Sequence, residues 1–305
     1  MRIFVAGATG VLGHRVVPGL IAAGHDVTAV ARTPARAHQL RTQGASPTAV
    51  DLFDAAAVAT AVRGSDAVMN LATAIPPMGR MLRRSAWEMT DRLRTDASRN
   101  LVDAALAAGA QRYIQEALGF VYPDRGAAWI DEDTALTAPP YARAVLTAEA
   151  QARRFDAGHG TGIALRFGLF YSADSEQTRQ MLAMARRGWL PLPGRGGAFR
   201  PWVHVDDAAS AVIAALDAPG GVYNVVEDRL LTNDGHASVL GGLVGRRLRR
   251  PSAWLAVGPL RLQTRSLRVS NRRLRDATGW RPSYASLREG WSEILPRLTT
   301  VAADV

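Results

Sequence analysis

The sequence predicts an α/β protein with a doubly wound parallel sheet and a smaller carboxy-terminal lobe. A short apolar strand, Arg2–Ala6, runs directly into glycines at positions 7, 10 and 13. After this strand, helix and strand patterns alternate with short connections, which favours βαβ units and a parallel sheet. The alternation becomes irregular beyond Phe167, where a second lobe is expected. The length of 305 residues suits one sheet domain and one smaller lobe.

The elements follow from the apolar pattern. We expect strands at 2–6, 26–31, 45–50, 66–72, 112–115, 162–167, 203–207 and 222–226. We expect helices at 14–23, 55–63, 88–108, 142–157, 176–187, 208–218, 234–246 and 271–278. A stretch rich in glycine and proline, Gly188–Pro201, lies in the irregular part. The sheet domain is therefore expected to comprise residues 1–168 and 201–226, and the second lobe residues 169–200 and 227–305.

The glycine turn after the first strand predicts a diphosphate-binding site. Gly7 permits a sharp turn, Gly10 permits close approach of a ligand to the backbone, and Gly13 permits tight packing of the next helix. The positive end of that helix would face an anion, and a dinucleotide supplies one. The alternative is a tight turn without a ligand. The residues expected to contact the diphosphate are Gly7, Thr9, Gly10, Val11, Leu12 and Gly13.

The end of the second strand predicts which dinucleotide binds. A carboxylate at this position binds the ribose 2′-hydroxyl of NAD, whereas arginine accommodates the 2′-phosphate of NADP. The sequence has no acid here but has Arg32 and Arg36, so NADP(H) is favoured over NAD(H). The alternative is two solvated arginines at a helix start. Asp51 and Leu52 are expected to border the adenine, and the nicotinamide ribose is expected at Leu71, Ala72 and Thr73.

Composition excludes several classes of site. The chain has no cysteine, and its six histidines lack metal-ligand spacing, so we expect no metal site. All 37 basic residues are arginine. They are dispersed despite the net charge of +10, which argues against nucleic acid as a partner; the cluster at 246–250 is interpreted as a solvated helix end or a subunit contact. We find neither a membrane-length apolar run nor a signal peptide, and we expect a cytoplasmic protein.

Several motifs along the chain together resemble one family. They are Gly7-Ala8-Thr9-Gly10-Val11-Leu12-Gly13, Pro140-Tyr141-Ala142-Arg143 with Ala148-Glu149, Val203-His204-Val205-Asp206-Asp207, Ser270-Asn271-Arg272-Arg273-Leu274, Gly279-Trp280-Arg281-Pro282 and Arg288-Glu289-Gly290. This set resembles the extended or atypical short-chain dehydrogenase/reductase superfamily, of the NAD-dependent epimerase/dehydratase type. The resemblance implies a Rossmann fold, a nicotinamide cofactor and a small-molecule substrate.

The resemblance also implies a catalytic tyrosine, lysine and serine, often with an asparagine. Tyr141 matches the tyrosine and is expected to contact the cofactor, but Val145 stands at the lysine position. Ala117 stands at the serine position and Thr90 at the asparagine position. A tyrosine without a neighbouring cation forms little phenolate near neutral pH, because its ordinary pKa is about 10. The usual general-base route is therefore handicapped.

Four residues are candidates for the diverged catalysis. Tyr141 is expected to donate a proton as a neutral phenol, and Glu116, Tyr122 and His204 lie on segments that line the cleft in this fold. Each of the last three has a structural alternative: Glu116 as a surface or capping residue, Tyr122 as core and His204 as a satisfied buried histidine. Asp206 and Asp207 are expected to cap the following helix. Four aromatic residues are candidates for an apolar pocket or for core: Trp129, Trp189, Phe199 and Trp202.

These features predict an enzyme that acts on a small, apolar or aromatic secondary metabolite of a bacterium. Two reaction classes stay open. The first is an NADP-dependent redox reaction on a reactive substrate that needs little proton assistance, and we favour it. The second is a non-redox isomerisation, dehydration or cyclisation. A non-catalytic NADP-sensing protein is a third possibility. The alanine-rich helix faces at 101–108 and 142–152 permit a homodimer.

Overall fold

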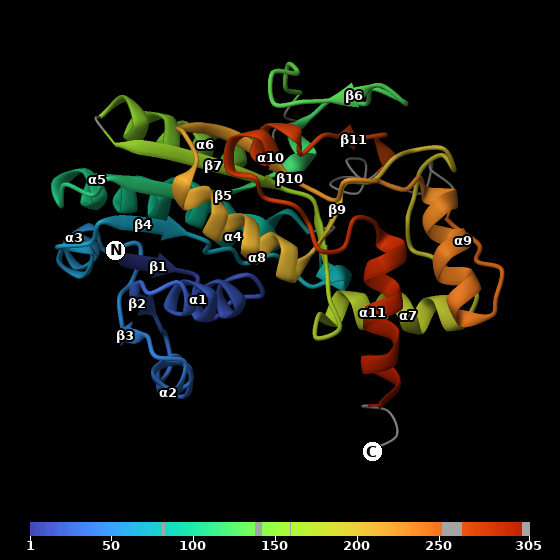
Figure 1. Ribbon diagram of the computed structural model, residues 1–305, viewed down its shortest axis with the longest axis horizontal. Coiled ribbons are helices and arrows are strands. Elements are labelled where there is room, and N and C mark those ends of the chain that lie inside the picture. Colours follow the sequence, from blue (N-terminus) through green and yellow to red (C-terminus); the bar gives the residue numbers. More distant parts are fainter. Residues whose placement is uncertain (81–82, 138–141, 159, 252–263, 301–305) are drawn as a thin grey trace.

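A seven-stranded parallel sheet forms the centre of the molecule (Figure 1). The computed structural model describes residues 1–80, 83–137, 142–158, 160–251 and 264–300. The strand order is β10-β7-β5-β4-β1-β2-β3, and every pairing within it is parallel. The chain therefore winds outward from β1 in both directions, which confirms the predicted doubly wound Rossmann sheet.

The strands of this sheet lie close to their predicted positions. They are β1 (Arg2–Ala6), β2 (Asp26–Val30), β3 (Ser46–Thr48), β4 (Ala67–Asn70), β5 (Arg112–Leu118), β7 (Thr161–Phe167) and β10 (Gly221–Val225). β5 is longer than predicted, so Glu116 and Ala117 lie inside the strand rather than after it. Two small parallel pairs lie outside the sheet: β6 (Trp129–Ile130) with β11 (Arg268–Val269), and β8 (Leu169–Tyr171) with β9 (Trp202–His204).

Helices connect the strands. They are α1 (Gly13–Ala22), α2 (Pro34–Thr42), α3 (Ala55–Val62), α4 (Glu88–Arg92), α5 (Ser98–Ala107), α6 (Arg143–Ala157), α7 (Glu176–Arg186), α8 (Val205–Ala214), α9 (Asn233–Val244), α10 (Arg272–Thr278) and α11 (Leu287–Thr300). The helix predicted at 88–108 is not uniform, because a π-helical turn, Leu93–Ala97, separates α4 from α5. Turns of this kind are rare in proteins, and many of them lie at functional sites.

Two apolar cores lie on the two faces of the sheet. On one face, Val16 of α1 and Val212 of α8 pack with Ile3 of β1. On the other face, Val58 of α3, Leu101 of α5 and Phe155 of α6 are buried. Alternate side chains of one strand serve the two cores: Tyr113 of β5 belongs to the second and Ile114 to the first. The sheet is covered on both sides, as a parallel sheet requires.

A third core lies beyond the carboxyl-terminal end of the sheet. Figure 1 shows α7, α9 and α11 gathered at the end of the molecule far from α3. Leu182 of α7, Leu240 of α9 and Trp291 of α11 are buried there with Tyr171 and Trp202. This arrangement is consistent with the expected second lobe, whose exact boundaries stay a prediction. Within the described residues, no helix has both the length and the apolar character of a membrane span.

Candidate functional site

The glycine turn after β1 packs tightly against the backbone of neighbouring segments. Gly7 has a φ of +80°, and a Cβ placed on it would lie 2.5 Å from the backbone carbonyl of Leu71. A Cβ on Gly13 would lie 2.2 Å from the carbonyl oxygen of Gly7. Both glycines therefore close the turn against the protein's own backbone. At Gly10 an added Cβ would meet only the Gly7 oxygen, at 3.3 Å, so the space beyond it is open.

The other predicted diphosphate contacts flank this space. Thr9 is partly exposed, Val11 is 51% exposed, and Leu12 is buried beneath the turn. The amide of Gly10 donates to the Gly7 oxygen at 3.0 Å, and the amide of His14 donates to the Gly10 oxygen at 3.1 Å. These bonds hold the turn rigidly at the positive end of α1, where backbone N–H groups attract an anion.

The predicted adenosine end carries two exposed guanidinium groups. Arg32 directly follows β2, and Arg36 lies in the first turn of α2, where its Nη1 donates to Gln39 at 3.0 Å. Neither arginine forms a salt bridge with any residue that the structure describes. Thr33 caps α2 by accepting from the amide of Arg36. Both exposed guanidinium groups thus lie at or just before the start of α2, and neither is paired with a carboxylate of the described residues.

The predicted adenine and nicotinamide contacts line the same edge of the sheet. Asp51 accepts from the amide of Phe53, and the carbonyl of the buried Leu52 accepts from Asn100. Leu71 is buried directly after β4, whereas Ala72 is partly exposed and Thr73 exposed. These residues therefore lie, with the glycine turn, along the carboxyl-terminal edge of the sheet.

Three of the positions that the resemblance names as catalytic are buried and hold none of the expected lysine, serine and asparagine. Tyr141 lies outside the described residues. Val145 and Ala117, at the lysine and serine positions, are both fully buried and pack with Val121 in one apolar cluster. Thr90, at the asparagine position, is buried, and its hydroxyl donates to the carbonyl of Ala74 at 2.5 Å. These three positions carry neither a cation nor a group that exchanges protons with a ligand.

Glu116 forms a buried ion pair that the sequence did not reveal. Arg94, in the π-helical turn, donates from Nη2 to both carboxylate oxygens, at 3.0 and 3.3 Å. The two side chains are 4% and 10% exposed. The capping and surface alternatives for Glu116 do not describe this environment. Arg94 lay inside a helix pattern with alternating charges, so no local signal singled it out.

Tyr122 is held in a buried polar network. Its hydroxyl accepts from Arg166 at 2.7 Å and donates to Asn224 at 2.8 Å. Arg166 in turn makes two 2.7 Å bonds to Glu149. Burial raises the pKa of the Tyr122 phenol to about 12. The side chain is fully buried, so this geometry favours the core alternative over a catalytic role.

His204 is also buried, and it caps a helix. Its Nδ1 accepts from the amide of Asp206 at 3.3 Å at the start of α8. Burial lowers its pKa to about 4. The prediction that the two aspartates cap α8 is wrong, because both lie inside its first turn. Asp207 instead accepts from the amides of Ser283 and Tyr284 and fastens the segment before α11.

The four candidate pocket aromatics have different surroundings. Trp202 is core, Trp189 is exposed, and the guanidinium of Arg268 lies over the rings of both Trp129 and Phe199, at 4.2 and 4.9 Å.

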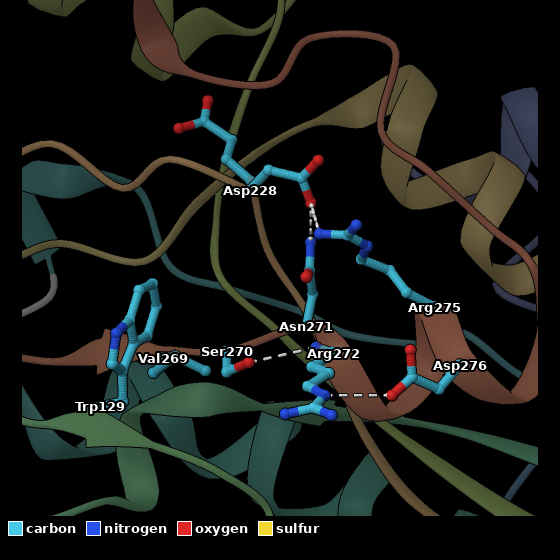
Figure 2. Close-up of a pocket in the computed structure, with 9 residues that line it drawn as sticks. Trp129, Asp228, Val269, Ser270, Asn271, Arg272, Arg275 and Asp276 are labelled. Carbon is cyan, nitrogen blue, oxygen red and sulfur yellow. Dashed lines mark hydrogen bonds and ion pairs between the residues drawn. The ribbon is translucent and has the colours of Figure 1, made fainter.

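Trp129 lines a cavity of about 320 Å³ beside α10 (Figure 2). Figure 2 shows Asn271 and Arg275 both pointing at Asp228, with hydrogen bonds of 2.8 and 3.1 Å. The lining residues are Trp129, Glu227, Asp228, Val269, Ser270, Asn271, Arg272, Arg275 and Asp276. None of them belongs to the predicted cofactor or catalytic set, and several of the charged ones pair with one another.

The chain is similar to known proteins along most of its length. The model of the NAD dependent epimerase/dehydratase family matches residues 3–226. A Streptomyces protein named 3-diazoavenalumate denitrifying reductase is 34% identical over 95% of this chain and 99% of its own length. The human epimerase family protein SDR39U1 is 28% identical over 81% of this chain and 82% of its own length.

Solved structures share the fold. The dTDP-glucose 4,6-dehydratase DesIV of Streptomyces venezuelae, solved with NAD, has a TM-score of 0.80 at 19% identity and covers 99% of this chain and 98% of its own. Human SDR39U1, solved with NADPH, has a TM-score of 0.78 at 24% identity and covers 98% of this chain and all of its own. Similar folds therefore hold either nicotinamide dinucleotide.

Proposed function

Because the chain belongs to the NAD dependent epimerase/dehydratase family, we propose that it is an NADP(H)-dependent reductase of a small aromatic metabolite. The observation that carries the proposal is a contrast within one site. The glycine turn is open at Gly10 and two exposed arginines follow β2, whereas Val145 and Ala117, at the positions of the family's lysine and serine, are buried and apolar. Such a site suits a substrate that accepts hydride without needing a proton from the protein.

The dinucleotide would be held along the edge described above. Gly10 and the amino-terminal end of α1 would receive the diphosphate, and Arg32 and Arg36 the 2′-phosphate. Leu71 and Thr73 would border the nicotinamide ribose. A bound reduced nicotinamide supplies hydride. The residues of this chain supply binding, orientation and exclusion of water.

The reductase relative supports a specific substrate class. Its name denotes a diazo compound that is reduced with loss of nitrogen. In such a reaction of an arenediazonium group, a carbon–hydrogen bond replaces the carbon–nitrogen bond, and dinitrogen leaves with that bonding pair. The hydride neutralises the positive charge, so the balanced products are the arene and dinitrogen, with no proton required. We therefore propose an electron-poor aromatic compound of the diazo type as the substrate.

Two measurements test the proposal. Fluorescence titration of the protein with NADPH and NADH is expected to show binding, with NADPH the tighter ligand. NADPH absorbance is then followed with benzenediazonium and 4-carboxybenzenediazonium, with a ketone and a quinone panel beside them. We expect NADPH consumption matched by arene formation, above the rate without protein.

The same assays define failure. If neither nucleotide binds, the redox assignment is wrong. If NADPH binds but no compound accelerates its consumption, the non-redox reaction class becomes the better assignment. Tyr141→Phe separates the mechanisms at saturating NADPH: it should leave kcat for diazonium reduction unchanged if no protein proton is used, and should lower kcat for ketone reduction if the phenol donates one.

A further inference from the structure

The Arg94–Glu116 ion pair lies where the reacting end of the proposed dinucleotide would be. Asn70, the last residue of β4, is in register with Gln115, so Glu116 extends one residue beyond the end of β4. It therefore stands level with Leu71, the first of the residues proposed to border the nicotinamide ribose. Side-chain alternation along β5 assigns Glu116 to the face of Ile114, which is the face covered by α1 and α8.

Arg94 reaches this position from the other face. It belongs to the segment between α4 and α5, and α5 packs on the opposite core. A side chain that joins Glu116 from there has to pass over the carboxyl edge beyond β4. The π-helical turn at Leu93–Ala97 contains one residue more than a turn of regular α-helix. The side chains in this turn, including that of Arg94, therefore point in other directions than they would in a regular helix.

A buried hydrogen-bond network around Gln115, the residue before Glu116, supports the ion pair. The side-chain amide of Gln115 donates to the backbone carbonyl of Glu116 at 2.7 Å. The oxygen of the Gln115 side chain accepts from Asn70, Ser98 and Tyr113 at 3.1, 3.1 and 2.8 Å. This buried network joins β5 to β4 and α5 at the residue next to Glu116.

One donor of the pair has no protein acceptor. Arg94 Nε is fully buried, and no residue in the described part of the chain accepts a hydrogen bond from it. A buried, unsatisfied donor is unfavourable and is rare in native structures. Desolvating two charges also opposes stability, so a buried ion pair is weak evidence for a purely structural role. The unpaired N–H at this edge is explained if a ligand oxygen completes it.

We propose, building on the proposed reductase function, that Arg94 is the ligand-contacting donor of this site and that Glu116 is its positioning residue. Arg94 Nε–H donates to a carbonyl or carboxylate oxygen of the molecule seated beside Leu71. Two ligands carry that chemistry: the carboxamide of the nicotinamide and the carboxylate of an aromatic substrate. The guanidinium thus supplies fixed positive charge in a protein that has no lysine.

The test uses the full-length protein with Arg94→Met, Arg94→Lys and the double variant R94M/E116M. The double variant replaces both charged side chains by apolar ones and so leaves no unpaired buried charge. A loss of binding in this variant therefore reports the lost ligand contact rather than misfolding. Thermal unfolding verifies the fold of each. NADPH binding is measured by fluorescence, and cinnamate and cinnamamide binding to the NADP⁺ complex by calorimetry.

A contact to the nicotinamide predicts at least 10-fold weaker NADPH binding in both methionine variants. A contact to the substrate predicts at least 10-fold weaker cinnamate binding with NADPH and cinnamamide unchanged, and a KM rise for 4-carboxybenzenediazonium but not for benzenediazonium. Arg94→Lys should restore part of either loss. Glu116→Gln should give the same pattern more weakly.

The inference is overturned if the folded double variant binds NADPH and cinnamate as the parent does. That result is distinct from failure of the reductase proposal, in which the parent protein itself binds no nicotinamide dinucleotide.

Discussion

Gly13 packs so closely on Gly7 that a Cβ on Gly13 would stand 2.2 Å from the Gly7 carbonyl oxygen. Gly10, between them, faces open space with one neighbour at 3.3 Å. The three glycines of one motif thus have separate tasks. Gly7 and Gly13 allow the turn to form, and Gly10 leaves open the space where we propose that the diphosphate binds.

This division predicts different outcomes for two alanine substitutions. Gly13→Ala should destabilise the protein by more than about 2 kcal/mol, because its Cβ meets rigid backbone. Gly10→Ala should leave unfolding nearly unchanged and weaken NADPH binding at least 10-fold. Urea denaturation and NADPH fluorescence measure the two effects. Gly242→Ala is the matched control, since Gly242 is exposed in α9 with open space around it and should change neither property adversely. If Gly10→Ala bound NADPH as tightly as the parent protein, the diphosphate would not bind at this turn.

Arg32 and Arg36 are expected to set the cofactor preference. Removing Arg32, Arg36 or both should weaken NADPH binding by about 1 to 3 kcal/mol, because each loses a charge-assisted bond to the 2′-phosphate. NADH binding should stay the same. Parallel fluorescence titrations measure the ratio, and Arg41→Ala, in the last turn of α2, serves as the control. An unchanged ratio in the double variant would show that the phosphate lies elsewhere.

Tyr122 is expected to stabilise the fold rather than to catalyse. Tyr122→Phe leaves the Arg166 Nη1 and the Asn224 oxygen without their shared hydroxyl, which should cost about 1 to 3 kcal/mol of unfolding free energy. Denaturant unfolding measures this loss. Tyr223→Phe, whose hydroxyl donates to one backbone carbonyl, should cost less. A stable Tyr122→Phe protein with lost turnover would restore Tyr122 as a catalytic candidate.

Glu227 should make the protein less stable at alkaline pH. Burial raises its pKa to about 8, above the ordinary value of 4.5, so the native state keeps a proton that the unfolded chain releases. Its stabilisation is complete below pH 4.5 and is lost as pH rises towards 8, at up to about 1.4 kcal/mol per pH unit.

Two buried histidines act in the opposite direction. Burial lowers the pKa of His204 to about 4 and that of His236 to about 3, so their contribution is complete above pH 6.5 and is lost on acidification. Stability should therefore peak near pH 6.5. Glu227→Gln should remove the decline between pH 6.5 and 8 in denaturation experiments, whereas Glu176→Gln at an exposed site should not. A decline that persists in Glu227→Gln would assign it to another group.

Much of the fold was predictable because its signals are local. Strands such as Arg2–Ala6 are continuous apolar runs, and the glycine turn specifies its own backbone. The errors arose where distant residues decide. β5 extends to Leu118 because it pairs with β7 over its whole length, and the π-helical turn interrupts a helix pattern that looked uniform. Asp207 was expected to cap α8, but Ser283 and Tyr284 supply the amides that it binds.

The sequence by itself determined the family, the glycine turn and the absence of lysine. Each is fixed by residue identity at short spacing. Only the tertiary structure decided the surroundings of Glu116, Tyr122 and His204, because their partners come from other segments of the chain. Tyr122, in the loop after β5, meets Arg166 of the neighbouring strand β7 and becomes buried, and Glu116 of β5 meets Arg94 of the π-helical turn. The charge of a side chain can be read from the sequence, but whether it is paired, buried or free to meet a ligand depends on packing between elements far apart in the chain.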